Sequence, residues 1–365
     1  MLFNPSIFIV KNEYHITILT SEASQVYVKI GNRFYFEDNS GIIPTIENVH
    51  KIIVKQSVLD KAGKYSVYVR KIIEKSCYYP KIDKAKIYNY NFKNDKLTDL
   101  RAIYLADLHG RFKDAVKLVD NYKDIDFIIS NGDQGESSSI EDVIEVNKFY
   151  SDITKGEIPI LFVRGNHDTR GKYAELLPKY SGMDNNKGYF TFKFRDIGGI
   201  ALDCGEDKID KCIEYGGSKT KFGVNKFELY RKNEISFIKK AKMPKCNYLF
   251  SVCHISFMLN DSMNGVFDID KKTYSLWSKY INEKNIDFML CGHLHYFDYA
   301  KPSETEHIQP HNYPVITASA VINDKPYGTL IEFNNHIATF SYVSPDGEVV
   351  DKFEIKCKGN DLHLS

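Results

Sequence analysis

The sequence predicts an α/β protein in two parts: a small all-β domain over residues 1–95 and an α/β domain over residues 96–365. Up to about residue 95, short β-branched and aromatic runs are separated by turn residues, without a helical period. From about residue 97, strand-like runs alternate with helical ones, which is typical of βαβ units around a central sheet. Several of these later strands end directly on side chains that can bind metals.

The first part reads as a series of short strands. Turn residues such as Asp38-Asn39-Ser40-Gly41 punctuate it. This spacing favours a small antiparallel sandwich. The predicted strands are Met1–Val10, Ile16–Leu19, Gln25–Ile30, Lys51–Val58, Lys64–Ile73 and Lys86–Phe92.

The second part alternates strands with helices. A helix is expected to begin near Ser138-x-x-Glu141, which reads as a capping box. The other predicted helices cover Phe112–Tyr122, Lys226–Ala241 and Lys271–Lys284, and the strands cover Ile103–Ala106, Ile125–Ser130, Ile158–Val163, Tyr248–Cys253 and Ile286–Cys291. Four tail strands should complete a second sheet packed against the first: Val315–Ala318, Gly328–Phe333, His336–Val343 and Val349–Ile355.

Five short segments each end a hydrophobic run with metal-binding side chains. They are Ala106-Asp107-Leu108-His109-Gly110, Asn131-Gly132-Asp133, Gly165-Asn166-His167-Asp168, Val252-Cys253-His254 and Gly292-His293-Leu294-His295. Open α/β sheets place their sites at the carboxyl ends of the strands, so these segments are expected to meet there. Seven of their side chains, namely two carboxylates, one amide and four imidazoles, can hold two divalent metals with one carboxylate shared. Two such metals suit attack of a metal-bound hydroxide on phosphorus.

Each motif has a simpler explanation when it is taken alone. Gly-Asp is a common turn, and Gly-Asn-His-Asp can be a turn with left-handed backbone. His293 and His295 could share one face of a strand as ordinary packing. All five motifs in one order, each after a hydrophobic run, favour a common metal site over these explanations.

The ordered set Asp-x-His, Gly-Asp, Gly-Asn-His-Asp, His and Gly-His-x-His resembles the signature of calcineurin-like metallophosphoesterases, from roughly Leu100 to the C-terminus. The resemblance implies a four-layer α/β/β/α sandwich and a dinuclear metal centre. It implies that one metal is held by Asp107, His109 and His295, that the other is held by Asn166, His254 and His293, and that Asp133 bridges both. Sites with nitrogen and oxygen ligands of this kind accept Mn, Fe or Zn.

The resemblance also implies a role for the histidine of Gly-Asn-His-Asp, which is not a metal ligand in that family. His167 would face the phosphate and assist the leaving oxygen, with Asp168 orienting it. The chemistry agrees, because a leaving alkoxide needs a proton or a positive charge as its bond breaks. An imidazole fixed by a carboxylate provides one.

A second resemblance is to bacterial relatives of purple acid phosphatases that carry an N-terminal fibronectin type III-like sandwich. It rests on Leu59-x-x-x-Gly63-Lys64-Tyr65-Ser66-Val67-Tyr68-Val69, Ala201–Lys208, Glu214-Tyr215-Gly216-Gly217 and Tyr230-Arg231. Two positions depart from the purple acid phosphatase pattern: Glu136 replaces a metal-binding Tyr three residues after Asp133, and His109 replaces a Gly. The resemblance therefore does not extend to an iron–phenolate centre. Arg164 and Arg170 flank the Gly-Asn-His-Asp loop and either grip a phosphate or are solvated surface residues.

The net charge, the length of the apolar runs and the cysteine content limit where the protein works and what it binds. A formal net charge of +1 gives no global field for nucleic acid or an anionic membrane. No apolar run approaches the roughly 20 residues of a membrane-spanning helix. The seven cysteines are scattered without a Cys-x-x-Cys pair, which fits free thiols in a reducing compartment. We expect a cytoplasmic protein with a small phosphorylated substrate; its oligomeric state stays open.

The leading hypothesis is a dinuclear metal-dependent enzyme that hydrolyses a phosphomonoester or phosphodiester. The alternative is a non-catalytic protein that binds metal, phosphate or a partner, with the N-terminal sandwich as the partner-binding module. The complete motif set, including His167, favours the enzyme.

Overall fold

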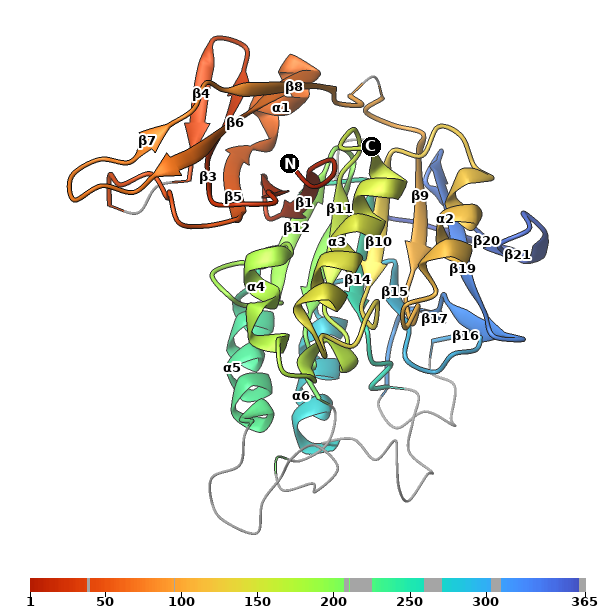
Figure 1. Cartoon of the computed structure of the whole chain (residues 1–365). Helices are drawn as coiled ribbons and strands as arrows, with labels where there is room; N and C mark the ends of the chain where they lie inside the picture. Colours follow the sequence, from red (N-terminus) through yellow and green to blue (C-terminus); the bar gives the residue numbers. More distant parts are fainter. Residues whose placement is uncertain are drawn as a thin grey trace.

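A computed structural model describes residues 1–37, 40–94, 96–206, 210, 225–258, 271–302 and 310–360. Its largest sheet has ten strands in the order β21-β20-β19-β9-β10-β11-β1-β2-β5, with β18 beside β19 (Figure 1). The neighbours from β9 through β10 and β11 to β1 run parallel. The strand bounds are β1 Ser6–Val10, β2 Glu13–Leu19, β5 Val49–Lys55, β9 Leu100–Leu105, β10 Phe127–Asn131, β11 Ile160–Val163, β18 Ala320–Ile322, β19 Lys325–Asn334, β20 Ile337–Val343 and β21 Val349–Lys356.

A second sheet of six strands packs on the first, in the order β12-β13-β14-β15-β17-β16. Aromatic side chains fill the space between the sheets: the rings of Phe127 and Phe194 lie 5.1 Å apart, and those of Phe250 and Phe333 lie 6.0 Å apart. Such pairs stabilise a sheet-on-sheet core beyond the area that they bury. The strand bounds are β12 Phe190–Phe194, β13 Ile197–Leu202, β14 Tyr248–Cys253, β15 Phe288–Cys291, β16 Asp298–Ala300 and β17 Val315–Thr317.

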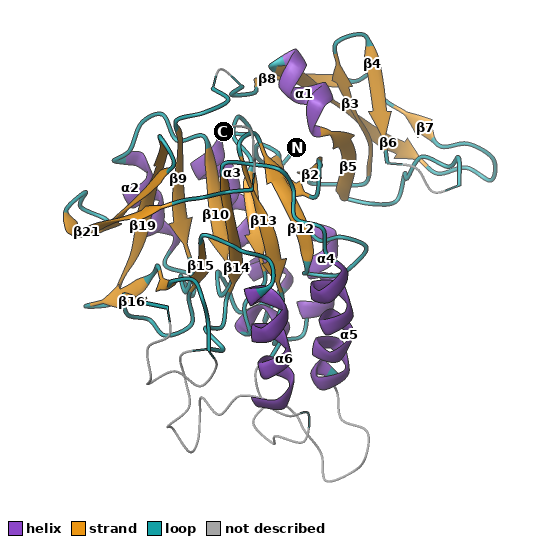
Figure 2. Ribbon diagram, turned by 180° about the vertical axis from the view of Figure 1, so that it is seen from behind, coloured by secondary structure: helices purple, strands orange, loops and turns teal. Residues whose placement is uncertain are grey.

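Helices cover both outer faces of the sheet pair (Figures 1 and 2). The first sheet carries α2 (Phe112–Asp120), α3 (Ile140–Thr154) and α4 (Leu177–Tyr180), and the second carries α5 (Phe227–Lys240) and α6 (Lys271–Asn282). The predicted four-layer α/β/β/α fold is confirmed. The capping box of α3 lies one residue later than predicted, since Ser139 and Asp142 exchange the two capping hydrogen bonds. Within the described ranges, no helix has the length and apolar character needed to cross a membrane.

The N-terminal region forms an antiparallel sheet of its own, in the part of the chain predicted to be a small all-β domain. Its order is β4-β3-β6-β7, with β8 beside β6, and the bounds are β3 Ser24–Ile30, β4 Arg33–Phe36, β6 Lys64–Glu74, β7 Lys81–Ile82 and β8 Lys86–Asn91. The predicted strand Lys51–Val58 is wrong at its end, because β5 stops at Lys55 and helix α1 (Gln56–Ala62) follows. Gly63 ends this helix in the left-handed conformation, with φ 61°.

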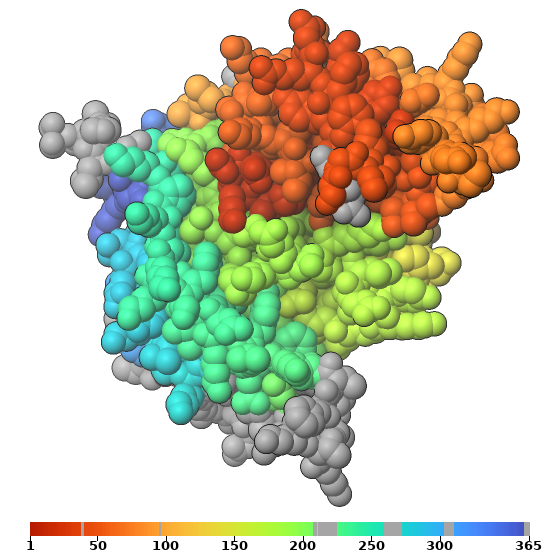
Figure 3. All heavy atoms as spheres, turned by 90° about the vertical axis from the view of Figure 1, so that its left-hand side faces the viewer, coloured from red at the N-terminus to blue at the C-terminus, as the bar shows by residue number. Residues whose placement is uncertain are grey.

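Three N-terminal strands belong to the large sheet. β1 lies parallel to β11, and β2 and β5 continue the sheet from it. The predicted division at residue 95 is therefore not a division between sheets. Figure 3 shows the N-terminal residues, in red and orange, packed directly on the yellow-green part of the chain.

The tail strands also differ from the prediction. β17 joins the second sheet, but β19, β20 and β21 extend the first sheet by antiparallel pairing with β9. The hydrophobic pattern of a segment shows that it is a strand, but the pattern is the same whichever sheet edge the strand joins. Phe333, in register with Leu100 on β9, points into the core between the sheets.

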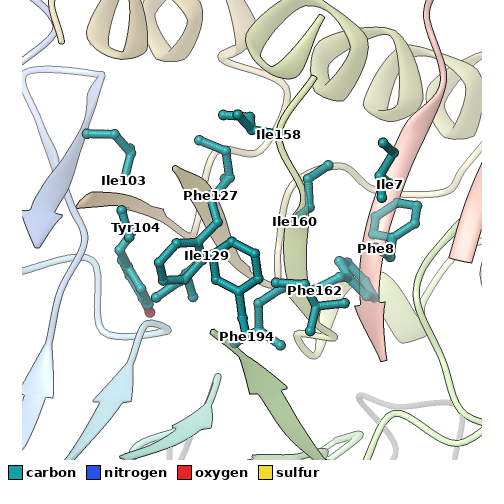
Figure 4. Close-up of a cluster of buried hydrophobic side chains, with 14 of the residues drawn as sticks. Ile7, Phe8, Ile103, Tyr104, Phe127, Ile129, Ile158, Ile160, Phe162 and Phe194 are labelled. Atoms are coloured by element: carbon teal, nitrogen blue, oxygen red, sulfur yellow. The ribbon is translucent and has the colours of Figure 1, made fainter. Parts of the chain in front are cut away.

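Phe8 on β1 is expected to be essential to stability. Its side chain is fully buried, and its ring meets that of Phe162 edge-on at 6.2 Å (Figure 4). It also meets the ring of Tyr150 edge-on at 5.7 Å. Phe8→Ala should lower the free energy of unfolding by about 3–5 kcal/mol, as large buried aromatic truncations do. Chemical denaturation measures this loss. Tyr79→Ala, at a position 85% exposed, is the control and should change it by less than about 0.5 kcal/mol. Equal unfolding midpoints for both variants would show that β1 does not belong to the cooperative core.

Candidate metal centre

The five predicted motifs lie at the carboxyl ends of five parallel strands. β9, β10 and β11 of the first sheet lead into the first three, and β14 and β15 of the second sheet lead into the others. Both sheets therefore contribute to one site, at the lower edge of the molecule in Figure 1. The N-terminal sheet lies at the opposite edge, and the three metal-type clusters found among the described residues contain only residues from 107 to 295.

The backbone of these loops is held in an unusual conformation. Five of the predicted ligands have left-handed φ angles although they are not glycine: Asp107 (58°), His109 (45°), Asp133 (55°), His293 (71°) and His295 (58°). Such residues cost of order 1–3 kcal/mol each and persist where the surrounding structure imposes them. Their concentration in one place marks this edge as a functional site.

Glycines let the loops approach each other closely. A Cβ on Gly132 would lie 2.3 Å from the backbone nitrogen of Gly165, and a Cβ on Gly165 would lie 2.2 Å from Oδ1 of Asp133. Any side chain at either position would separate β10 from β11 at the point where Asp133 and Asn166 emerge.

The first cluster joins Asp107, His109 and His295. Nε2 of His295 lies 3.4 Å from Oδ1 of Asp107 and 3.3 Å from Nε2 of His109. The buried Asp107 carboxylate also accepts hydrogen bonds from the backbone N–H of His293 at 3.0 Å and the hydroxyl of Ser319 at 2.7 Å. Burial alone would raise the pKa of Asp107, but its hydrogen bond with His295 and the charge on His254 lower it overall.

The second cluster joins Asp133, His254 and His293. His254 Nδ1 lies 2.6 Å from the Asn131 carbonyl and so donates to it, which leaves Nε2 facing Oδ2 of Asp133 at 3.1 Å. Asn166 belongs here too, because its Oδ1 lies 2.9 Å from Nδ1 of His293. Burial would lower the pKa of His254, but the carboxylates of Asp133 and Asp107 raise it to about 10.

These residues fit a pair of divalent metals. The Nε2 atom of His254 is fully buried, has no hydrogen-bond partner in good geometry among the residues that the structure describes, and is aimed between two carboxylates. Those carboxylates attract a positive charge to that nitrogen, which a proton or a metal can supply. Asp133 belongs both to this cluster and to a third one with His109 and His167, so its position suits a shared ligand. The structure thus brings together all seven predicted ligands.

His167 lies beside Asp133 and His109, but its carboxylate partner differs from the predicted one. Nδ1 of His167 lies 3.0 Å from Oε2 of Glu136, and the same carboxylate lies 3.0 Å from Nδ1 of His109. The predicted partner, Asp168, is buried and instead accepts hydrogen bonds from the backbone N–H groups of Gly165 and Asp133, each at 2.9 Å. Asp168 therefore fixes the loops, and Glu136 orients the imidazole.

The position of Glu136 in the sequence could have identified it as the partner of His167. It stands three residues after Asp133, at the position where purple acid phosphatases have a metal-binding tyrosine. Burial would raise the pKa of Glu136, but its hydrogen bonds with His167 and His109 lower it, so the carboxylate is ionised and accepts from both rings.

The two flanking arginines are not solvated surface residues. Arg164 makes a two-pronged pair with the buried Asp203, at 2.8 and 3.2 Å, and stacks over the ring of Tyr230. The Tyr230 hydroxyl donates to the same carboxylate at 2.7 Å. Arg170 pairs with the buried Glu206. Glu214 to Gly217, which contributed to the resemblance, lie outside the described residues.

Comparison with known proteins shows the family and the fold of the chain. The calcineurin-like phosphoesterase family matches residues 100–297, more than half of the chain, and the chain belongs to that family. A purple acid phosphatase from yellow lupin (Lupinus luteus) shares the fold with a TM-score of 0.62 at 13% identity, covering 96% of this chain and 74% of its own. GAP50, the anchor in the inner membrane complex of Plasmodium, gives a TM-score of 0.46 at 16% identity, covering 72% and 91%.

One curated relative matches a shorter stretch. The outer membrane protein assembly factor BamA of Neisseria meningitidis is 29% identical over 141 residues, which are 35% of this chain. The match covers only 16% of the length of that relative.

Proposed function

We propose that the protein is a two-metal phosphoesterase that hydrolyses a phosphomonoester or phosphodiester. The observation that carries the proposal is the position of Asp133, which is buried where the metal-type clusters meet, with the His167 ring beside it. When bound, two divalent ions such as Mn, Fe or Zn would acidify the attacking water and offset the charge that develops on the phosphoryl oxygens. Asp107, His109 and His295 would hold one ion, Asn166, His254 and His293 the other, and Asp133 both.

The protein groups around the ions have separate tasks. The Glu136 carboxylate fixes the tautomer of His167 by accepting from Nδ1, so Nε2 is the atom presented to a substrate. This nitrogen can stabilise or protonate the leaving oxygen. The left-handed loops hold the ligands in place before the substrate arrives, which avoids reorganisation during the reaction.

Metal analysis and turnover together test this proposal. The full chain, loaded with Mn²⁺ and desalted, should contain two metals and hydrolyse p-nitrophenyl phosphate or its bis-ester. Chelation should abolish turnover, and added Mn²⁺ should restore it. A protein that holds two metals yet hydrolyses neither ester, nor a panel of alkyl phosphates, would support the non-catalytic alternative. A single metal in a saturated preparation would contradict the dinuclear assignment.

A further inference from the structure

Arg170 contacts the ring of His167 on the side opposite Glu136. It ends the short 3-10 helix η1 (His167–Thr169), and its backbone N–H donates to the carbonyl of His167 at 3.0 Å. Its Nη1 atom lies 3.3 Å from Nε2 of His167. The guanidinium therefore sits beside the nitrogen that the proposed mechanism presents to the substrate.

A buried carboxylate fixes the direction of this guanidinium. Nε and Nη2 of Arg170 pair with the two oxygens of Glu206, at 2.5 and 3.1 Å. The Glu206 side chain is only 3% exposed, whereas that of Arg170 is 33% exposed. A two-pronged pair holds the guanidinium plane, so the remaining nitrogen, Nη1, is directed at His167. Because a buried carboxylate is costly without a partner, Glu206 keeps the Arg170 guanidinium paired and in place.

We infer that Arg170 binds the substrate: its Nη1 group contacts a terminal oxygen of the phosphoryl group beside His167 and thereby favours phosphomonoesters over phosphodiesters. The inference rests on the proposed function. When Nε2 of His167 is protonated, it and Nη1 of Arg170, which lie 3.3 Å apart, can donate to neighbouring oxygens of one phosphoryl group. A monoester carries close to two negative charges near neutral pH. A diester carries one, and its second ester group takes the place of a charged oxygen. A fixed positive charge at this position therefore distinguishes the two substrate classes.

A purely positional role for Arg170 predicts a different result. If Arg170 only oriented the His167 ring, its loss would weaken leaving-group assistance for both substrate classes alike and would leave phosphate affinity unchanged. The affinity for phosphate and the ratio of kcat/KM for the monoester to that for the diester therefore distinguish a substrate-binding role from a positional one. A fall in activity alone does not distinguish them.

The test compares Arg170→Gln with Arg101→Gln in the full Mn²⁺-loaded chain. Arg101 is a matched control, since its side chain is 27% exposed and its Nε lies 3.2 Å from Oε1 of Glu332, on β9 near the end opposite the site. For Arg170→Gln, kcat/KM on p-nitrophenyl phosphate should fall by about 10- to 100-fold, the size of a lost hydrogen bond to a charged group. The value for the bis-ester should change little. Calorimetry with inorganic phosphate should show weaker binding by a similar factor, at unchanged metal content.

The control should match the wild type in every readout. Equal losses on both esters with unchanged phosphate affinity, or no change in Arg170→Gln, would overturn the inference. If the wild type hydrolyses neither ester, the proposed function fails, and phosphate calorimetry still decides whether Arg170 binds the anion. Should Arg170→Gln not fold, Glu206→Gln provides the second variant. It releases the guanidinium from its anchor and should weaken phosphate binding and monoester preference together; unchanged values would contradict the inference.

Discussion

His167→Ala is expected to lower turnover by about 10²- to 10⁴-fold, the usual cost of losing a general acid, while metal content stays near that of the wild type. The ring lies between Glu136, which accepts from its Nδ1, and Arg170, whose Nη1 lies 3.3 Å from its Nε2, so these side chains position it and it is not among the seven proposed metal ligands. The loss should be larger for alkyl phosphates than for aryl phosphates, because good leaving groups need less protonation. Steady-state kinetics on both ester types, with metal analysis of the same preparations, measures the effect.

Two carboxylate variants sharpen this test. Glu136→Gln should lower turnover in the same direction, since it removes the charge that orients His167. Asp168→Asn should mainly lower the melting temperature, because that carboxylate accepts from two backbone N–H groups. If His167→Ala loses its metals, or keeps full activity on an alkyl phosphate, the role assigned to His167 is wrong.

Asp133→Asn is expected to remove metal and activity together. Asp133 is buried, faces His254 at 3.1 Å and lies in two of the metal-type clusters. Changing a residue that only supports a metal ligand typically costs 10- to 100-fold in metal affinity. Loss of the proposed shared ligand should therefore cost more than about 100-fold, which competition with a chelator of known affinity can measure.

A matched buried aspartate provides the control for Asp133→Asn. Asp126 is fully buried at the start of β10 and pairs with Arg195, far along the strand from the site. Asp126→Asn should lower the melting temperature and keep both metals. Two tightly bound metals in Asp133→Asn would show that Asp133 does not bridge them.

The sequence was sufficient to predict which side chains come together at the site, because each motif directly follows a hydrophobic strand. For example, β9 ends at Leu105 and Asp107 follows it, and β14 ends at Cys253 and His254 follows it. The side chains that end parallel strands must meet at one sheet edge, so local pattern alone determined where these residues lie. The fold class followed from the same alternation of strands and helices.

Long-range pairing was not predictable in this way. A strand such as β1 or β19 shows the same hydrophobic pattern whichever sheet it joins, and the choice depends on partners far along the chain. The partner of His167 was missed for a similar reason. Asp168 is next to His167 in sequence, but its carboxylate accepts hydrogen bonds from the backbone of Gly165 and Asp133. Glu136, which lies in the neighbouring loop, contacts the His167 ring instead.

The place of β1 in the large sheet has a consequence for how the chain folds. Near β1, the backbone N–H of Asn4 donates to Ser151, 147 positions later, and Arg111 after β9 pairs with Asp324, 213 positions later. Contacts between such distant residues slow folding, because a long loop must close before they form. During synthesis on the ribosome, β1 can pair with β11 only after β11 has been made, and β9 can pair with β19 only after β19 has been made. The hairpins of the N-terminal sheet need only nearby segments and can form first. We therefore expect the metal centre to be the last part of the molecule to assemble, since it joins both sheets.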